Sequence, residues 1–230
     1  MIYRNIVEGK FISRPNRFIA NVEVNGKTEI CHVKNTGRCK ELLQSGARVF
    51  LSESHNPQRK TRYDLIAVYK ESILFNIDSQ APNKVFGEWL QESEYFKNIT
   101  YIKPECFYKK SRFDFYFEYG GKKAFAEVKG VTLERNGVFL FPDAPTERGV
   151  RHLNELCEAL DDGYEAYAVF VLQASGATSF MPNAETHPQF AEALFNAKQK
   201  GVKILCLDCN VTPDSLKINN FVPLHINFKP

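Results

Sequence analysis

The sequence predicts a mixed α/β protein, built as a small β-barrel followed by a larger α/β domain, with the boundary near residue 80. Up to about residue 75 the chain alternates apolar and polar residues between turn signals, and beyond residue 100 strand and helix patterns follow one another. The 230 residues allow two domains. A composition of 43% hydrophobic and 25% charged residues excludes disordered, collagen-like and disulfide-scaffold proteins.

Charge divides near the same boundary. The first 75 residues hold 13 Lys and Arg against 7 Asp and Glu, whereas the remaining 155 hold 17 against 20. The net charge of +3 therefore conceals a basic front part and a mildly acidic remainder. Because a basic surface attracts phosphates, near-neutrality of the whole chain does not exclude a nucleic-acid partner.

The first residues contain no apolar segment of the secretory type, and no apolar run approaches the roughly 18–20 residues of a membrane span. We therefore expect a cytoplasmic protein without a membrane partner. The six cysteines are then reduced thiols. Cys206 and Cys209 form a lone CxxC within an apolar run, which favours buried structural residues over a redox or zinc site.

The front part is predicted to be a barrel of about five short strands, of the OB type or the SH3-like type. Asn25-Gly26 is a two-residue hairpin signal between two alternating runs, and a basic polar loop occupies residues 58–62. OB barrels often bind oligonucleotides. The runs that we assign to strands are 17–24, 27–33, 47–52 and 64–69.

The second part is predicted to hold a mixed sheet with crossover helices, because strand and helix patterns alternate towards its end. Pro145 is expected in the first turn of the second helix. The predicted helices are 81–96, 145–160 and 188–200, and the predicted strands are 101–108, 112–119, 123–132, 137–141, 166–172 and 202–208.

One hairpin of this sheet carries paired acidic residues. Gly120-Gly121 is a hairpin signal, and a two-residue loop there places Asp114 directly opposite Glu127. Lys129 lies two residues beyond Glu127 and therefore projects from the same face. Two carboxylates beside an ammonium group are suited to holding Mg²⁺ or Mn²⁺ for the hydrolysis of a phosphodiester. The alternative interpretation is a solvated sheet face with a Glu–Lys pair.

Several segments resemble the sugar fermentation stimulation protein A family. The most specific are Phe125-Ala-Glu-Val-Lys-Gly-Val-Thr-Leu133, Phe141-Pro-Asp-Ala-Pro-Thr-Glu-Arg-Gly149 and Arg151-His-Leu-Asn-Glu-Leu156, and earlier ones are 16–22, 35–37, 82–83 and 112–115. The resemblance spans nearly the whole chain. It implies an OB-like nucleic-acid-binding domain over residues 1–80 and a restriction-endonuclease-like domain of the PD-(D/E)xK type over 81–230. The family has been linked to DNA binding in sugar-utilisation regulation and to nuclease activity.

Carried over residue by residue, the resemblance makes Asp114 the Asp of the PD half-motif, with Arg112-Phe113 in place of the usual proline. Glu127 and Lys129 become the ExK. Glu88 matches an acidic residue that such nucleases often place on the preceding helix; a simply solvated carboxylate on the helix face is the alternative. Asp143 is a further metal candidate, because the hairpin at Asn136-Gly137 would pair it with Gly130 beside Lys129, although its side chain would face the opposite side. Arg38-Cys39 departs from the small or apolar residue expected after Gly37.

Candidate contacts to the nucleic-acid backbone are basic residues of the front part, and Phe18 is a candidate stacking platform. The alternative is that the charges only solubilise the surface and that Phe18 belongs to the core. Arg148 follows Thr146 and Glu147 at the start of a helix, where a phosphate would be favoured; ordinary capping is the alternative, and His152 is a weaker candidate. The basic candidates of the front part are Arg17, Lys34, Arg38, Lys40, Arg59, Lys60 and Arg62.

These patterns favour a nuclease that hydrolyses DNA or RNA with Mg²⁺ or Mn²⁺. A DNA-binding regulator of sugar-utilisation genes that keeps the nuclease fold without catalysis is the second hypothesis. A structural or sugar-binding protein is a third, which no feature of the sequence specifically favours. A two-fold homodimer is the default assembly for a chain of this kind.

Overall fold

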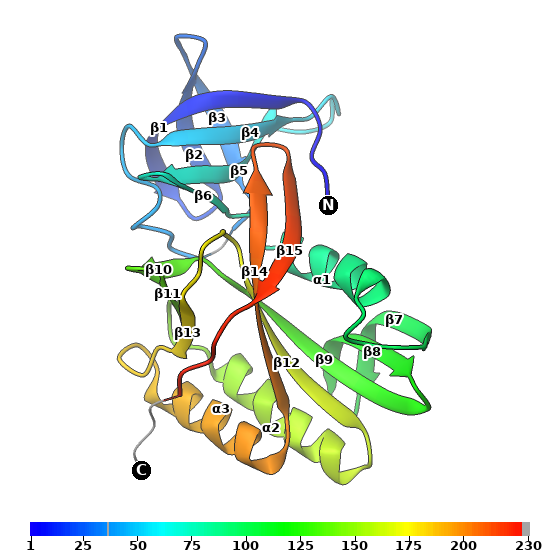
Figure 1. Ribbon diagram of the computed structural model, residues 1–230. Coiled ribbons are helices and arrows are strands. Elements are labelled where there is room, and N and C mark those ends of the chain that lie inside the picture. Colours follow the sequence, from blue (N-terminus) through cyan, green and yellow to red (C-terminus); the bar gives the residue numbers. More distant parts are fainter. Residues whose placement is uncertain (36, 227–230) are drawn as a thin grey trace.

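The structure, a computed structural model, describes residues 1–35 and 37–226 and shows two stacked parts (Figure 1). Thr36, within the Asn35–Gly37 segment, and residues 227–230, at the end of the predicted second domain, lie outside the described residues. No helix in the described chain is long and apolar enough to cross a membrane.

The front part is an OB-type barrel, and its strand order excludes the SH3-like alternative. Its six-stranded sheet has the order β3-β2-β1-β4-β5-β6, and β3 also pairs with β5 in parallel, which closes the barrel. Asn25 and Gly26 both have positive φ, as the predicted hairpin requires. The strands are β1 (Ile6–Asn16), β2 (Ile19–Val24), β3 (Lys27–Val33), β4 (Arg48–Glu53), β5 (Tyr63–Lys70) and β6 (Ile73–Asn76).

The second part is built on a six-stranded mixed sheet with the order β15-β14-β12-β9-β8-β7. The centre is parallel and both edges are antiparallel. A small sheet, β10-β11-β13, lies at the end of the second part that faces the barrel (Figure 1). The strands are β7 (Ile99–Tyr108), β8 (Ser111–Tyr119), β9 (Lys122–Val131), β10 (Leu133–Arg135), β11 (Val138–Phe141), β12 (Glu165–Leu172), β13 (Ser179–Pro182), β14 (Lys203–Thr212) and β15 (Ser215–Phe221).

Helices cover both faces of the large sheet. On one face α1 (Ala81–Glu92) buries Phe86 against Phe115, with ring centroids 5.4 Å apart. On the other face α2 (Glu147–Asp161) and α3 (Pro188–Lys200) pack side by side. The helix α1 ends earlier than the predicted residue 96. Pro145 lies before the N-cap Thr146 rather than in the first turn, because the Thr146 hydroxyl accepts the Gly149 N–H.

The two parts share one buried core. Phe75 of β6 stacks on Phe139 of β11 with ring centroids 5.9 Å apart, and both side chains are almost completely buried. Lys70 of the barrel binds the buried Glu134 of β10 at 2.5 Å. In Figure 1 the β14–β15 hairpin extends from the large sheet to the barrel, where Val211 packs against a barrel cluster. Because apolar and ionic contacts both cross the boundary, the two parts are packed together as one body.

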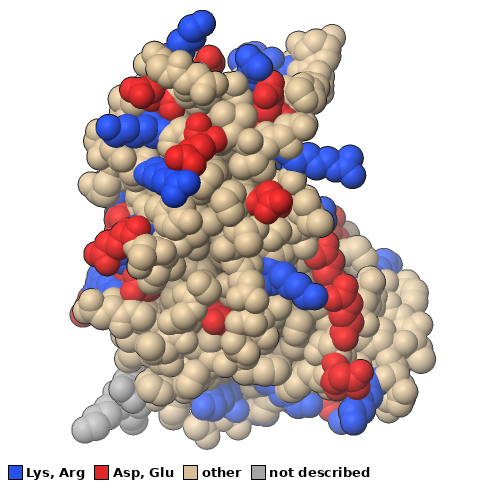
Figure 2. Space-filling model, turned by 45° about the horizontal axis from the view of Figure 1, so that its top comes forward, with Lys and Arg blue, Asp and Glu red and all other residues tan. Residues whose placement is uncertain are grey.

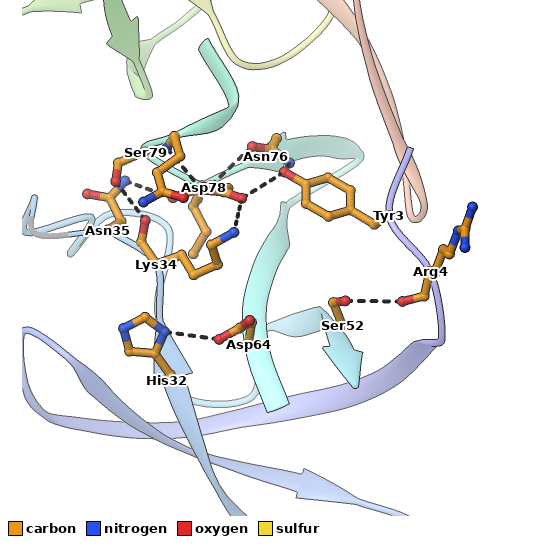
Figure 3. Close-up of polar contacts among 12 residues, drawn as sticks. Tyr3, Arg4, His32, Lys34, Asn35, Ser52, Asp64, Asn76, Asp78 and Ser79 are labelled. Atoms are coloured by element: carbon orange, nitrogen blue, oxygen red, sulfur yellow. Dashed lines mark hydrogen bonds and ion pairs between the residues drawn. The ribbon is translucent and has the colours of Figure 1, made fainter. Parts of the chain in front are cut away.

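A polar network reinforces this junction around Asp78, whose side chain is 0% exposed (Figure 3). Its Oδ2 accepts hydrogen bonds from Lys34 Nζ at 2.7 Å and from Tyr3 Oη at 3.2 Å. Gln173, at the end of β12, donates from Nε2 to Asn76 Oδ1 and to the Asp78 carbonyl, both at 3.0 Å. Each buried polar group in this network therefore has partners, which is the condition for burying a charge at low cost.

Candidate active site

The acidic hairpin forms in the predicted register. Phe115 pairs with Ala126, and Gly120 and Gly121 both adopt the positive φ of a type I′ turn. The ladder between β8 and β9 ends at this pair, one position short of the predicted pairing of Asp114 with Glu127. Beyond it the Asp114 carboxylate, rather than a backbone carbonyl, accepts the Val128 N–H at 2.7 Å. The two strands separate here, which leaves the acidic side chains at an opening in the sheet.

Asp114 is held from two sides. Asn83 of α1 donates to Oδ1 at 2.7 Å, while the Val128 N–H occupies Oδ2. Burial, and then the negative charge of Glu127, raise the pKa of Asp114, although these hydrogen bonds and Lys129 oppose the shift. An ionised Asp114 therefore remains costly even with Lys129 nearby, and a further cation would reduce that cost.

Glu127 is 5% exposed and is oriented by two basic side chains. Its Oε1 accepts hydrogen bonds from Lys129 Nζ at 2.5 Å and from the His152 ring. Burial would raise the pKa of Glu127, but the hydrogen bond from His152 and the charge of Lys129 outweigh it and lower the pKa. The other oxygen, Oε2, is buried and has no hydrogen-bond partner among the described residues.

The helix α2 completes this arrangement through Arg148 and His152, one turn apart. The Arg148 Nε–H donates to His152 Nε2 at 3.3 Å. Because a guanidinium can only donate, Nε2 must accept, so the ring proton is assigned to Nδ1 and donates to Glu127. Arg148, His152 and Glu127 thus form a hydrogen-bonded chain from the start of α2 to the sheet.

The residues at this opening fit a divalent metal ion. A buried carboxylate oxygen without a partner is costly unless something binds it, and Glu127 Oε2 is such an atom beside a second carboxylate. Oxygen donors are the ligands of Mg²⁺ and Mn²⁺. No group of three or more His, Cys, Asp or Glu side chains is placed to hold a metal within residues 1–35 and 37–226. Two carboxylates are nevertheless enough for Mg²⁺, which keeps waters and substrate phosphates as its other ligands.

Two further metal candidates are not brought to this opening. Glu88, on α1, binds the Met1 amino group at 2.6 Å and lines a hollow with Trp89 and β15 residues, away from the Asn83 side of the helix. Asp143 follows the hairpin of β10 and β11, which has the predicted register but whose ladder ends at Leu133 and Leu140. The predicted pairing of Asp143 with Gly130 therefore does not form. Its Oδ2 instead lies 3.4 Å from the Arg38 N–H of the barrel.

The basic candidates of the barrel fall into two groups. Lys34, Arg59 and Arg62 are committed to ion pairs with Asp78, Asp64 and Glu53 respectively. Arg17, Arg38 and Lys40 line one hollow together and form no ion pair among the described residues. Lys60 lies in the Arg59 loop and likewise has no described ion-pair partner. On the face shown in Figure 2, basic and acidic side chains are interspersed over the barrel.

Sequence reasoning placed His152 below Arg148 as a candidate and did not connect it to Glu127. The signal in the sequence was the spacing of Arg148 and His152, because residues four apart on a helix share a face. The contact with Glu127 spans 25 positions and depends on how α2 packs on the sheet. The CxxC pair forms neither a disulfide nor a metal site among the described residues. Cys206 and Cys209 are free and buried in β14, and burial raises the pKa of both thiols.

Comparison with known proteins agrees with this two-part architecture. Residues 12–77 match the model described as the SfsA N-terminal OB domain, and residues 80–215 match the sugar fermentation stimulation protein RE domain. The chain belongs to the sugar fermentation stimulation protein (SfsA) family. The front barrel is thus the OB domain of an SfsA protein, and the second part is its restriction-endonuclease-like domain.

SfsA relatives match over their full length. The sugar fermentation stimulation protein homolog of Desulfitobacterium hafniense is 58% identical over 226 residues, which cover 98% of this chain and 99% of that protein. The homolog of Clostridium beijerinckii is 55% identical and covers 96% and 98%. A solved structure of Pyrococcus furiosus SfsA in complex with Ca²⁺ is 27% identical, with a TM-score of 0.85 over 98% of both chains.

Proposed function

We propose that this SfsA protein is a metal-dependent nuclease that hydrolyses phosphodiester bonds of DNA or RNA. In this proposal residues 1–80 bind the nucleic acid, and residues 81–230 cleave it with Mg²⁺ or Mn²⁺ held by Asp114 and Glu127. The observation that carries the proposal is the state of Glu127. One of its oxygens is fixed by Lys129 and His152, and the other is buried without a described partner, beside a second carboxylate. A relative solved with Ca²⁺ also supports a divalent cation.

A bound divalent ion would neutralise phosphate charge and lower the pKa of a coordinated water. The chain's own residues prepare the site for this. His152 and Lys129 hold Glu127 by Oε1, so that Oε2 remains available, and Asn83 and the Val128 N–H fix the orientation of Asp114. Side chains that are already oriented accelerate a reaction, because they do not have to rearrange when the transition state forms.

Lys129 has a second role in this proposal. Its ammonium group is partly exposed, whereas the Glu127 carboxylate that it contacts is buried. It can therefore face a phosphate while remaining paired, and it stabilises the negative charge that develops on the cleaved phosphate. Arg148, which begins the chain of hydrogen bonds through His152, lies near the N-terminus of α2, a position that favours an anion.

The test is cleavage of DNA and RNA oligonucleotides by the full chain with Mg²⁺ or Mn²⁺. We expect Asp114→Ala and Lys129→Ala to lower the cleavage rate at least ~100-fold, the scale of a lost electrostatic contact in an active site. Binding of the oligonucleotide should change little in both variants. Asp161→Ala, which removes an exposed carboxylate paired with Lys200, is the control and should cleave like the wild type.

Equal cleavage by the wild type and both variants would contradict the proposal, because the activity would then not depend on this site. Salt-sensitive binding without cleavage under either metal ion would favour the non-catalytic regulator instead.

A further inference from the structure

A cleft of about 410 Å³ lies between the barrel and the nuclease-like domain. Its barrel wall is the segment around Asn35, Gly37 and Arg38, and its other walls are residues 130–133 and 140–146. Gly130, which begins the floor, directly follows Lys129. The cleft therefore extends from the surface of the barrel to the residue next to the proposed catalytic lysine, whose own side chain does not line it.

A second hollow of about 260 Å³ continues the cleft on the barrel side. It is lined by Arg17, Lys40, Arg38 and Gly37, and the last two also line the cleft. The shared wall is held in place by Arg14, whose guanidinium donates to the carbonyls of residues 17, 35, 37 and 38 at 2.6–2.8 Å. The two hollows thus form one path with an ordered wall, which we call the strand groove.

Charge along the strand groove is available for a ligand. Arg17, Arg38 and Lys40 form no ion pair among the described residues, whereas Arg59 and Arg62 of the 54–62 loop are both neutralised by carboxylates. An unpaired cation can contact a phosphate without first breaking a salt bridge. Of these barrel cations, the three that line the second hollow are therefore better placed to contact a nucleic acid than the two neutralised arginines.

An exposed aromatic ring lies beside Arg17 of this groove. Phe18 follows Arg17 in the β1–β2 turn, is 45% exposed, and has the Arg17 guanidinium 4.8 Å from its ring centroid. The β1–β2 loop belongs to the surface with which OB folds bind oligonucleotides. A ring beside a cation is the usual stacking platform for a base, but a base can stack on it only when it is not enclosed in a duplex.

We propose that the substrate is single-stranded nucleic acid, which runs from Phe18 and Arg17 past Arg38 into the cleft, where Gly130 adjoins the proposed metal site at Lys129. This inference rests on the proposed nuclease function and adds the class of substrate. The volume of the cleft lies within the range of about 300–1,000 Å³ for pockets that enclose a small molecule. We expect a cleft of this size to take up a single strand and to exclude a base-paired duplex.

The experiment compares a 30-nucleotide single strand with the blunt duplex of the same sequence, using the full chain and Mn²⁺. We expect the single strand to be cleaved at least ~10-fold faster. Binding is measured with Ca²⁺ in place of Mn²⁺. Phe18→Ala should weaken binding of the single strand about 5- to 100-fold, which corresponds to one lost stacking contact. Arg38→Gln should also weaken it and should reduce its dependence on salt.

Matched controls separate the groove from general effects. Tyr101→Ala removes an exposed ring from β7, and Lys27→Gln removes a positive charge from the same barrel at the opposite end of β2; neither should change binding more than about twofold. Equal cleavage of duplex and single strand, or equal binding by Phe18→Ala and Tyr101→Ala, would overturn the single-strand inference and leave the nuclease standing. Selective binding of the single strand without cleavage would support the groove and contradict the nuclease.

Discussion

At the scale of single residues, the candidate site brings two carboxylates together at a place where the negative charge of Asp114 opposes folding. Glu127 is buried and Asp114 is partly buried, and the two carboxylates are close enough for the charge of Glu127 to raise the pKa of Asp114. A carboxyl whose pKa is higher in the folded state than in the unfolded state binds its proton more tightly when folded. Its ionisation at pH 7 therefore opposes folding, and this cost is absent below the unfolded pKa. Such local conflicts are typical of functional sites.

We accordingly expect Asp114→Asn to stabilise the metal-free protein by about 0.5–2 kcal/mol, as relief of a strained active site commonly does. The neutral amide can still bond both Val128 and Asn83, once the Asn83 amide turns over. Thermal unfolding at pH 7 with a chelator measures the gain. Added Mn²⁺ should raise the Tm of the wild type but not that of the variant. The surface control Asp161→Asn should stay within ~0.5 kcal/mol. A lower Tm for the metal-free variant would refute this account.

At the scale of elements, α2 connects the edge of the cleft to the sheet. Thr146 caps the helix at the cleft, Arg148 and His152 lie on one face, and Leu153 and Leu156 pack into the core. The hydrogen bond that His152 donates to Glu127 fixes which carboxylate oxygen stays free. In the proposed nuclease, His152 therefore has the role of a positioning residue that acts through Glu127.

We expect His152→Ala to lower the cleavage rate about 10- to 100-fold and to raise the Mn²⁺ concentration needed for half-maximal rate, since partners of metal ligands have effects of this size. His152→Asn should recover part of the loss, because its amide can replace the donor at Nδ1. Arg151→Ala, an exposed neighbour on α2, is the control. If both His152 variants lost activity with an unchanged Mn²⁺ dependence, the histidine would only support packing.

At the scale of the whole molecule, the buried contacts of the junction determine how the OB domain faces the nuclease-like domain. Asp78, Asn76 and Gln173 form a buried network, and Lys70 pairs with Glu134 across the boundary. Burial would raise the pKa of Glu134, but the hydrogen bonds from Lys70 and from the Gly137 N–H outweigh it and lower the pKa. The cleft that lies between the two parts depends on this geometry.

The sign of the pH dependence follows from that lowered pKa. Glu134 stabilises the fold above the pKa of about 4.3 that it has when unfolded, and this contribution is lost as the pH falls towards its folded pKa. We expect Glu134→Gln to cost about 1–3 kcal/mol at pH 7 and to flatten the fall in stability between pH 6 and 3. Urea unfolding at several pH values measures both. Glu158→Gln, at an exposed pair with Lys109, is the control; an unchanged slope in Glu134→Gln would contradict the role assigned to the pair.

Local patterns were enough to predict much of this molecule. The two-residue turns at Asn25-Gly26 and Gly120-Gly121, the register that brings Phe115 to Ala126, and the three helices all follow from periodicity and turn chemistry. Three strands of the second part escaped prediction. β10 and β13, with three and four residues, are too short to show a clear alternation, and β15 alternates only at Leu216 and Ile218 before it becomes polar. The choice between an OB and an SH3-like barrel needed the contact between β3 and β5.

The sequence by itself determined the acidic hairpin, since side-chain alternation and a tight turn bring Asp114, Glu127 and Lys129 together within 16 residues of chain. Only the tertiary structure decided which other side chains contact the acidic residues of that hairpin. Packing of α2 brings His152 to Glu127, and the N-terminus takes Glu88 away from the site. Among the described residues it also leaves Arg17, Arg38 and Lys40 without an ion pair, while Arg59 and Arg62 are neutralised. Local patterns repeat over a few residues, whereas ion pairs and burial depend on segments that meet only when the chain folds.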